Sequence, residues 1–85
     1  ERSWMKFVMF RESGCDSGNA RGGLYKGLFQ FAPATFNAKG GVNIWDGADQ
    51  IRIVHQMYSS SGGSSSYLSS QWPHAHNAYI SIYGW

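Results

Sequence analysis

The first apolar run of the chain, residues 4–10, repeats with the period of an α-helix. The positions that share one helical face are Met5, Val8, Met9 and Glu12. This i, i+3, i+4, i+7 spacing predicts an amphipathic helix over residues 3–12, with Ser3 as its N-cap. The carboxylate of Glu12 is therefore expected on the same face as three apolar side chains.

Glycine and proline interrupt the pattern after this helix. Residues 13–27 contain five glycines and several polar turn formers, which predicts a loop with at most a short hairpin. Pro33 fits the first turn of a short helix over residues 34–38, because the N–H that proline lacks would have no helical partner there. The pair Gly40-Gly41 is expected to end that helix.

A further amphipathic helix is expected to begin after Asp46, whose side chain is typical of an N-cap. Asp49 stands three residues later and partly copies a capping box. The stripe assigned to the buried face of this helix consists of Ile44, Ala48, Ile51, Val54, His55 and Tyr58. The helix should end near Ser59.

Serine dominates the next segment. Residues 59–70 hold eight serines and two glycines, a composition typical of a flexible connection. Pro73 then opens a last helix with apolar positions at helical spacing. These positions are Ala75, Ala78, Tyr79 and Ile82. The whole pattern predicts a small, mainly α-helical fold in a single domain, residues 1–85.

Composition narrows the functions open to such a domain. Only 14% of the 85 residues are charged and the net charge is +2, which excludes a strongly electrostatic nucleic-acid binder but fits mild attraction to an anionic polymer. No run approaches the roughly 18 apolar residues of a membrane span. The single cysteine, Cys15, excludes an internal disulfide and is expected to be an inert thiol. We expect a monomer.

Three histidines raise the question of a metal site. His74 and His76 are two residues apart, so on a helix they point to different faces. Neither they nor His55 have a cysteine or carboxylate that would complete a ligand set. The sequence therefore predicts no metal and no other cofactor.

Glu12 is the strongest candidate for chemistry. A carboxyl group set into an apolar wall is harder to ionise, so it can keep its proton near neutral pH and act as a general acid. The alternative is an ordinary solvated glutamate in the last turn of a helix. The motifs that follow Glu12 in the chain favour the catalytic interpretation.

These motifs, in chain order, are Glu12-Ser13-Gly14, the run Tyr-Lys-Gly-Leu-Phe-Gln-Phe over residues 25–31, and Ala34-Thr35-Phe36. Together they resemble the lysozyme-like superfamily, in particular the bacterial soluble lytic transglycosylases and the transglycosylase-like domain of resuscitation-promoting factors. A later triplet, Asp49-Gln50-Ile51, resembles the Asp-Gln-Ile that opens a helix in many phage and cell-wall members. The resemblance extends over residues 4–36.

The resemblance implies a lysozyme-like fold with a catalytic cleft that cuts the β-1,4 bond between N-acetylmuramic acid and N-acetylglucosamine in peptidoglycan glycan strands. Glu12 would then act first as acid and then as base, while the 6-hydroxyl of the muramic acid attacks and leaves a 1,6-anhydro product. Two alternatives stay open. One is a lysozyme-type muramidase, in which Asp16 or a positioned water replaces that attack, and the other is a non-catalytic glycan-binding module. We expect Asp16 instead to form a turn, accepting a hydrogen bond from an amide such as that of Gly18.

The resemblance also implies substrate-binding residues around the acid. Gln30 matches the family's glutamine near the cleavage point, and Ser13 matches the serine beside the acid. Tyr25 and Phe29 flank the second motif and can line either the cleft or the core.

Aromatic residues later in the chain complete the expected site. Trp45 and Trp72 lie beside turn signals, where an exposed indole ring can stack on a sugar. Tyr79 corresponds to a family tyrosine that hydrogen-bonds the acid, although this chain reads Asn-Ala-Tyr where the family has Ala-Tyr-Asn. The implied location is extracellular, at the cell wall, or in a phage virion. A start at Glu1, without an initiator Met, suggests a mature or excised domain of a longer protein.

Overall fold

The computed structural model describes residues 1–19 and 24–85. Its helices are α1 (Arg2–Ser13), α2 (Pro33–Ala38), α3 (Gly47–Ser60), α4 (Ser65–Gln71) and α5 (Pro73–Tyr83). Within the described residues, one antiparallel bridge between Lys26 and Phe31 is the whole of the β structure. The predicted mainly α-helical class is therefore confirmed. Gly22 and Gly23 of the predicted loop lie outside the described residues.

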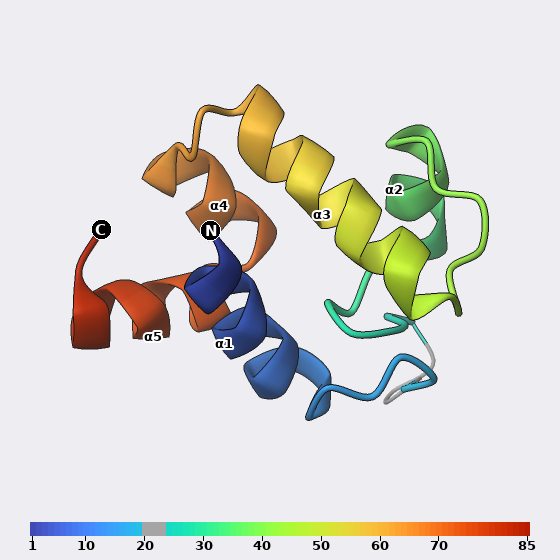
Figure 1. Cartoon of the computed structure of the whole chain (residues 1–85), viewed down its shortest axis with the longest axis horizontal. Helices are drawn as coiled ribbons and strands as arrows, with labels where there is room; N and C mark the ends of the chain where they lie inside the picture. The colour runs from blue at the N-terminus through green and yellow to red at the C-terminus, as the bar shows by residue number, and fades with distance from the viewer. Residues whose placement is uncertain (20–23) are drawn as a thin grey trace.

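The helices pack around an aromatic core. Figure 1 shows α1 against α5, with α4 beside α5, while α3 extends from the α4 side of the molecule to α2. Trp72 lies where these parts meet, with its ring centre 5.5 Å from that of Trp4, 6.1 Å from Phe29 and 6.0 Å from Phe31. Each such pair contributes about 0.5–1.5 kcal/mol beyond the burial of its area. Aromatic rings from both halves of the sequence thus hold the helices together.

Helix α1 forms where the periodicity predicts it, but its first cap differs. The helix begins one residue earlier than expected, and Glu1 rather than Ser3 occupies the N-cap position. The hydroxyl of Ser3 lies instead 3.3 Å from that of Tyr79. At the other end, Gly14 adopts a left-handed conformation (φ 65°), and its N–H donates to the carbonyl of Phe10 at 3.0 Å. This turn ends the helix directly after the Glu12-Ser13 pair.

Helix α3 begins as predicted, but it buries a different face. The side chain of Asp46 accepts a hydrogen bond from the N–H of Ala48 at 3.1 Å, which confirms the N-cap. The buried side chains of the helix are Gln50, Ile53, Val54 and Met57. Ile51 is 39% exposed and His55 is also exposed, so the predicted stripe is wrong except at Val54 and the half-buried Ile44 and Tyr58. The prediction was based mainly on apolar residues, whereas the first buried residue of the helix, Gln50, is polar.

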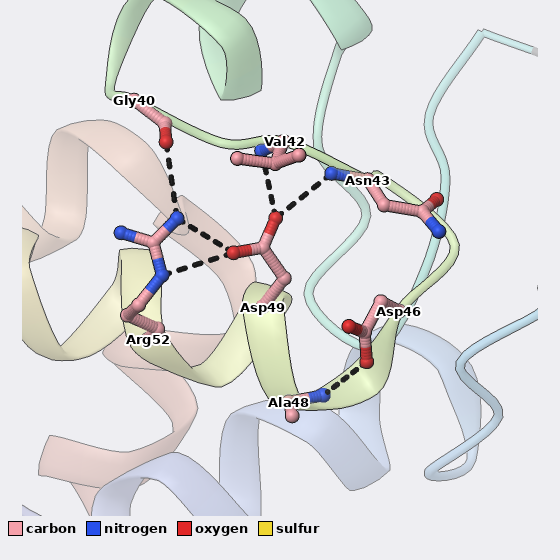
Figure 2. Close-up of polar contacts among 7 residues, drawn as sticks. All are labelled: Gly40, Val42, Asn43, Asp46, Ala48, Asp49 and Arg52. Carbon is pink, nitrogen blue, oxygen red and sulfur yellow. Dashed lines mark hydrogen bonds and ion pairs between the residues drawn. The ribbon is translucent and has the colours of Figure 1, made fainter.

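Asp49 fastens a loop to α3 instead of completing a capping box. Its carboxylate accepts hydrogen bonds from the N–H groups of Val42 (2.7 Å) and Asn43 (2.9 Å). The same carboxylate pairs with Arg52, which also donates to the carbonyl of Gly40 (Figure 2). These backbone hydrogen bonds, followed by Arg52, lower the pKa of Asp49 from 3.8 to about 2.

The serine-rich segment contains a helix, so the prediction of a flexible connection over residues 59–70 is wrong. Gly62 and Gly63 make a left-handed turn, and the hydroxyl of Ser64 then accepts a hydrogen bond from the N–H of Tyr67 as the N-cap of α4. Leu68 is fully buried in the core. Serines that resemble a linker in sequence act here as a helix cap, because a serine hydroxyl satisfies the free N–H groups of a first turn.

Helix α5 begins at Pro73 as predicted, and most of its expected apolar face is covered, with Ala75 buried and Ala78 and Tyr79 half-buried. Its buried residues are Ala75 and His76, while Ile82 is 62% exposed. The indole N–H of Trp4 donates to Nδ1 of His76 at 3.0 Å, and Nε2 of His76 lies 2.8 Å from the hydroxyl of Ser65. Burial lowers the pKa of His76, which favours the neutral ring that this arrangement requires. In the described part of the chain, no helix has the length and apolar character needed to cross a membrane.

Candidate active-site cleft

A cleft of about 650 Å³ opens beside the C-terminal end of α1. One wall carries Arg11 and Glu12, and the opposite wall is the junction of α4 and α5. Residues of that second wall are Ser70, Gln71, Trp72, Pro73 and His74. Tyr25 and Gln30 also line the cleft, and both continue into an adjoining hollow of about 180 Å³ that reaches Thr35. Segments far apart in the sequence therefore share one groove.

Glu12 is the only carboxylate that lines this cleft among the described residues. It lies in the last turn of α1 and is half-buried. Met5 and Val8 on the preceding turns are buried, and Met9 packs at the edge of the core, so the expected apolar face is present. The arrangement gives one acidic group with apolar side chains behind it and an open groove before it.

Gln30 lies in a four-residue turn that the Lys26–Phe31 bridge closes. The two bridge hydrogen bonds measure 2.9 and 2.8 Å. Gln30 has φ 54°, a left-handed conformation that costs a non-glycine residue about 1 kcal/mol or more. Its Nε2 donates to the carbonyl oxygens of Gly27 (2.8 Å) and Asn19 (3.3 Å), which fixes the side chain. A strained residue held rigidly in a cleft is a candidate functional residue.

Ser13 lies beneath the cleft rather than in its lining. The side chain is buried, and its hydroxyl is 2.9 Å from the carbonyl oxygen of Leu28 and 3.0 Å from that of Met9. It also accepts a hydrogen bond from the N–H of Asp16. Ser13 thus ties the end of α1, which carries Glu12, to the turn that carries Gln30.

Gln50 supports the same turn from below and was not among the predicted site residues. Its fully buried side chain accepts a hydrogen bond from the N–H of Leu28 at 2.9 Å and donates to the carbonyls of Ser17 and Ile44. A Cβ atom at Gly27 would lie 2.6 Å from Nε2 of Gln50, so only glycine fits there. The available signal was the Asp49-Gln50-Ile51 triplet, which carried the resemblance but gave no role for the glutamine.

The expected aromatic residues separate into two groups. Tyr25 is 49% exposed and lines the cleft. Trp72 also borders the cleft, although it is only 4% exposed and its indole N–H donates to the carbonyl of Phe29 at 3.0 Å. Phe29 is fully buried in the core. Tyr79 lies near the start of α1, with its ring 5.4 Å from that of Phe7, so it is not part of the cleft.

Trp45 was one of the two tryptophans expected to stack on sugars. It is 44% exposed, but it does not line the cleft. The ammonium of Lys26 lies 5.9 Å from the centre of its ring. The wall formed by Ser70, Gln71 and His74 was missed, because their segment was expected to be a linker followed by an ordinary first helical turn. The buried Leu68 and the capping Ser64 were the available signals for it.

Asp16 forms the turn that the sequence predicts. Its exposed carboxylate accepts a hydrogen bond from the N–H of Gly18 at 2.9 Å, and it does not line the cleft. Cys15 is exposed and has a positive φ of 63°. Over residues 1–19 and 24–85, no group of three metal-ligating side chains comes together.

Comparison with known proteins identifies no family for this chain. No family model, no curated protein and no solved structure matches the chain.

Proposed function

We propose that this cleft binds peptidoglycan glycan strands and cleaves the β-1,4 bond between N-acetylmuramic acid and N-acetylglucosamine, with Glu12 as the general acid. The observation that carries the proposal is the position of Glu12, which among the described residues is the one carboxylate of a cleft that it shares with Gln30. The motifs around both residues resemble lytic transglycosylases, and we propose a lysozyme-like fold on the same grounds. A secreted, cell-wall or phage-borne enzyme follows from that resemblance.

The chemistry needs a proton at one oxygen and a nucleophile at one carbon. Glu12 donates its proton to the glycosidic oxygen as the bond from that oxygen to C1 of the muramic acid breaks. The 6-hydroxyl oxygen of the same sugar forms a bond to C1, and its proton passes to the Glu12 carboxylate. The enzyme ends as it began, and the product is a 1,6-anhydro sugar. One carboxylate is sufficient for this sequence of steps.

The other cleft residues can bind the sugar. The Nε2 of Gln30 donates to backbone carbonyls, and its Oε1 is the side-chain atom that can accept a hydrogen bond from a sugar hydroxyl or N-acetyl N–H. Tyr25 and the edge of Trp72 offer apolar surface for sugar faces. Ser70 and Gln71 offer polar groups on the opposite wall.

Substitution of Glu12 by Gln tests the proposal, because the amide keeps the shape of the side chain but cannot deliver a proton. We expect Glu12→Gln to lose clearing of bacterial cell walls in a zymogram while keeping its helical circular-dichroism spectrum. Asp16→Asn is the matched control, since it changes a carboxylate four residues away that is outside the cleft. Substantial activity in folded Glu12→Gln would refute the assignment, and a wild-type protein that binds cell walls without cleaving them would favour a glycan-binding module.

A further inference from the structure

A second hollow, of about 630 Å³, lies between the exposed side of α1 and the end of α5. Its lining consists of Arg2, Ser3, Lys6, Phe7 and Phe10 from α1 and Tyr83 from α5. We call this surface the outer groove. It shares no lining residue with the cleft that contains Glu12.

The outer groove exposes large apolar groups. Of its lining residues, Phe10 is 68% exposed and Tyr83 is 66% exposed. The half-buried Phe7 also lines the groove, and its ring centre lies 6.1 Å from that of Tyr83. Apolar side chains gathered at this density on a small domain usually mark a binding surface.

Positive charge borders these aromatic rings. Arg2 and Lys6 line the groove and lie one helical turn apart on α1. The guanidinium of Arg11, which lines the cleft that contains Glu12, is 5.9 Å from the centre of the Phe7 ring. Helix α5 contains no acidic residue. Of the acidic residues nearest along α1, Glu1 pairs with His55 at 2.6 Å and Glu12 lines the other cleft. The groove therefore complements an anionic partner.

We propose that the outer groove binds the surface of an anionic lipid bilayer. Aromatic side chains favour the headgroup region of a membrane, and Lys and Arg beside them attract anionic headgroups. An acidic peptide would explain the cations alone, whereas exposed aromatic rings beside cations match the apolar interior and the anionic headgroups of a bilayer together. The proposal does not depend on glycan cleavage.

Vesicle co-sedimentation tests this surface directly. We expect the wild-type chain to bind vesicles of phosphatidylcholine with phosphatidylglycerol, and not vesicles of phosphatidylcholine alone. Lys6→Gln should weaken binding about fivefold, because each basic residue near an anionic surface contributes about that factor. Phe10→Ser should weaken it by a similar factor through loss of interfacial apolar contact.

Matched controls come from the far side of the molecule. Lys39→Gln and Val42→Ser remove an exposed cation and an 85% exposed apolar side chain outside the groove, and both should bind vesicles like wild type. Glu12→Gln should also bind normally, which separates this proposal from the catalytic one. Equal binding to both vesicle types, equal losses in the control variants, or groove-dependent binding of polyglutamate or peptidoglycan in place of vesicles would each overturn it.

Discussion

At the scale of one residue, Gln30 has a strained backbone conformation that lowers the stability of the fold near the cleft. A left-handed backbone favours glycine, yet this position carries a side chain whose amide nitrogen is bound twice to backbone carbonyls. The side chain stands where the cleft and its adjoining hollow meet. Its strain and its position together argue for a role in binding the substrate and not for a role in stability alone.

Two substitutions at this position separate these roles. Gln30→Ala should lower turnover on peptidoglycan about tenfold or more, a loss of at least ~1.4 kcal/mol in transition-state stabilisation. Gln30→Gly should lose the same activity, while its unfolding temperature should stay close to that of wild type, because relief of the backbone strain offsets the lost hydrogen bonds. A large drop in unfolding temperature with unchanged turnover would mean that Gln30 is structural. Thermal unfolding and product release from cell walls measure the two quantities.

The sequence predicted some residues of the cleft and its support but not others, for a physical reason. Glu12 and Gln30 could be located because their motifs carry the chemistry in the side chain itself. The places of Ser13 and Gln50 depend on carbonyl and amide groups 15 and 22 residues away, and no local pattern states those partners. A buried polar residue looks like an exposed one until its hydrogen bonds are known.

At the scale of elements, periodicity located helices better than it located their buried faces. The positions of α1, α2, α3 and α5 follow from apolar spacing, proline and the Asp46 cap. Helix α4 did not, because a serine cap and a single buried leucine are weak signals in a serine-rich segment. The face of α3 was wrong because the polar Gln50 is fully buried, and on α5 the polar His76 is fully buried beside the expected Ala75.

The link between Asp49 and the loop before α3 predicts a pH dependence. The folded pKa of Asp49, about 2, lies below its ordinary value of 3.8, so the folded state favours the charged form more than the unfolded state does. Its contribution to stability is therefore complete above about pH 4 and is lost as the pH falls toward 2. We expect denaturant unfolding to show a smaller loss of stability over this range in Asp49→Asn than in wild type.

Arg52→Gln serves as the control for that measurement. The largest causes of the lowered pKa are the backbone N–H groups of Asn43 and Val42, which this variant leaves in place. Most of the pH dependence should therefore remain in Arg52→Gln. An unchanged dependence in Asp49→Asn would show that other groups cause it.

At the scale of the whole molecule, the cleft forms because helices that are distant in the sequence are held in fixed positions against one another. The indole N–H of Trp4 can only donate, so Nδ1 of His76 accepts and Nε2 carries the proton that it donates to Ser65. This buried chain of hydrogen bonds joins α1, α4 and α5. These same helices provide Glu12 on one wall and His74 on the other, residues that lie far apart in the sequence. Local patterns alone could not have predicted this pairing.

The reaction type is a prediction about the cleft as a whole. Ordinary glycosidases place two carboxyl groups roughly 5 to 9.5 Å apart across the bond that they cut. Of the described residues that line this cleft, only Glu12 has a carboxylate, and the nearby Asp16 is bound to the amide of Gly18 outside it. We therefore expect Asp16→Asn to keep most of its activity and anhydromuramyl ends to dominate the products. Mass spectrometry of digested peptidoglycan measures this, because a reducing end is heavier than an anhydro end by one water. Products with only reducing ends would identify a lysozyme-type hydrolase, in which water replaces the 6-hydroxyl while Glu12 still supplies the proton.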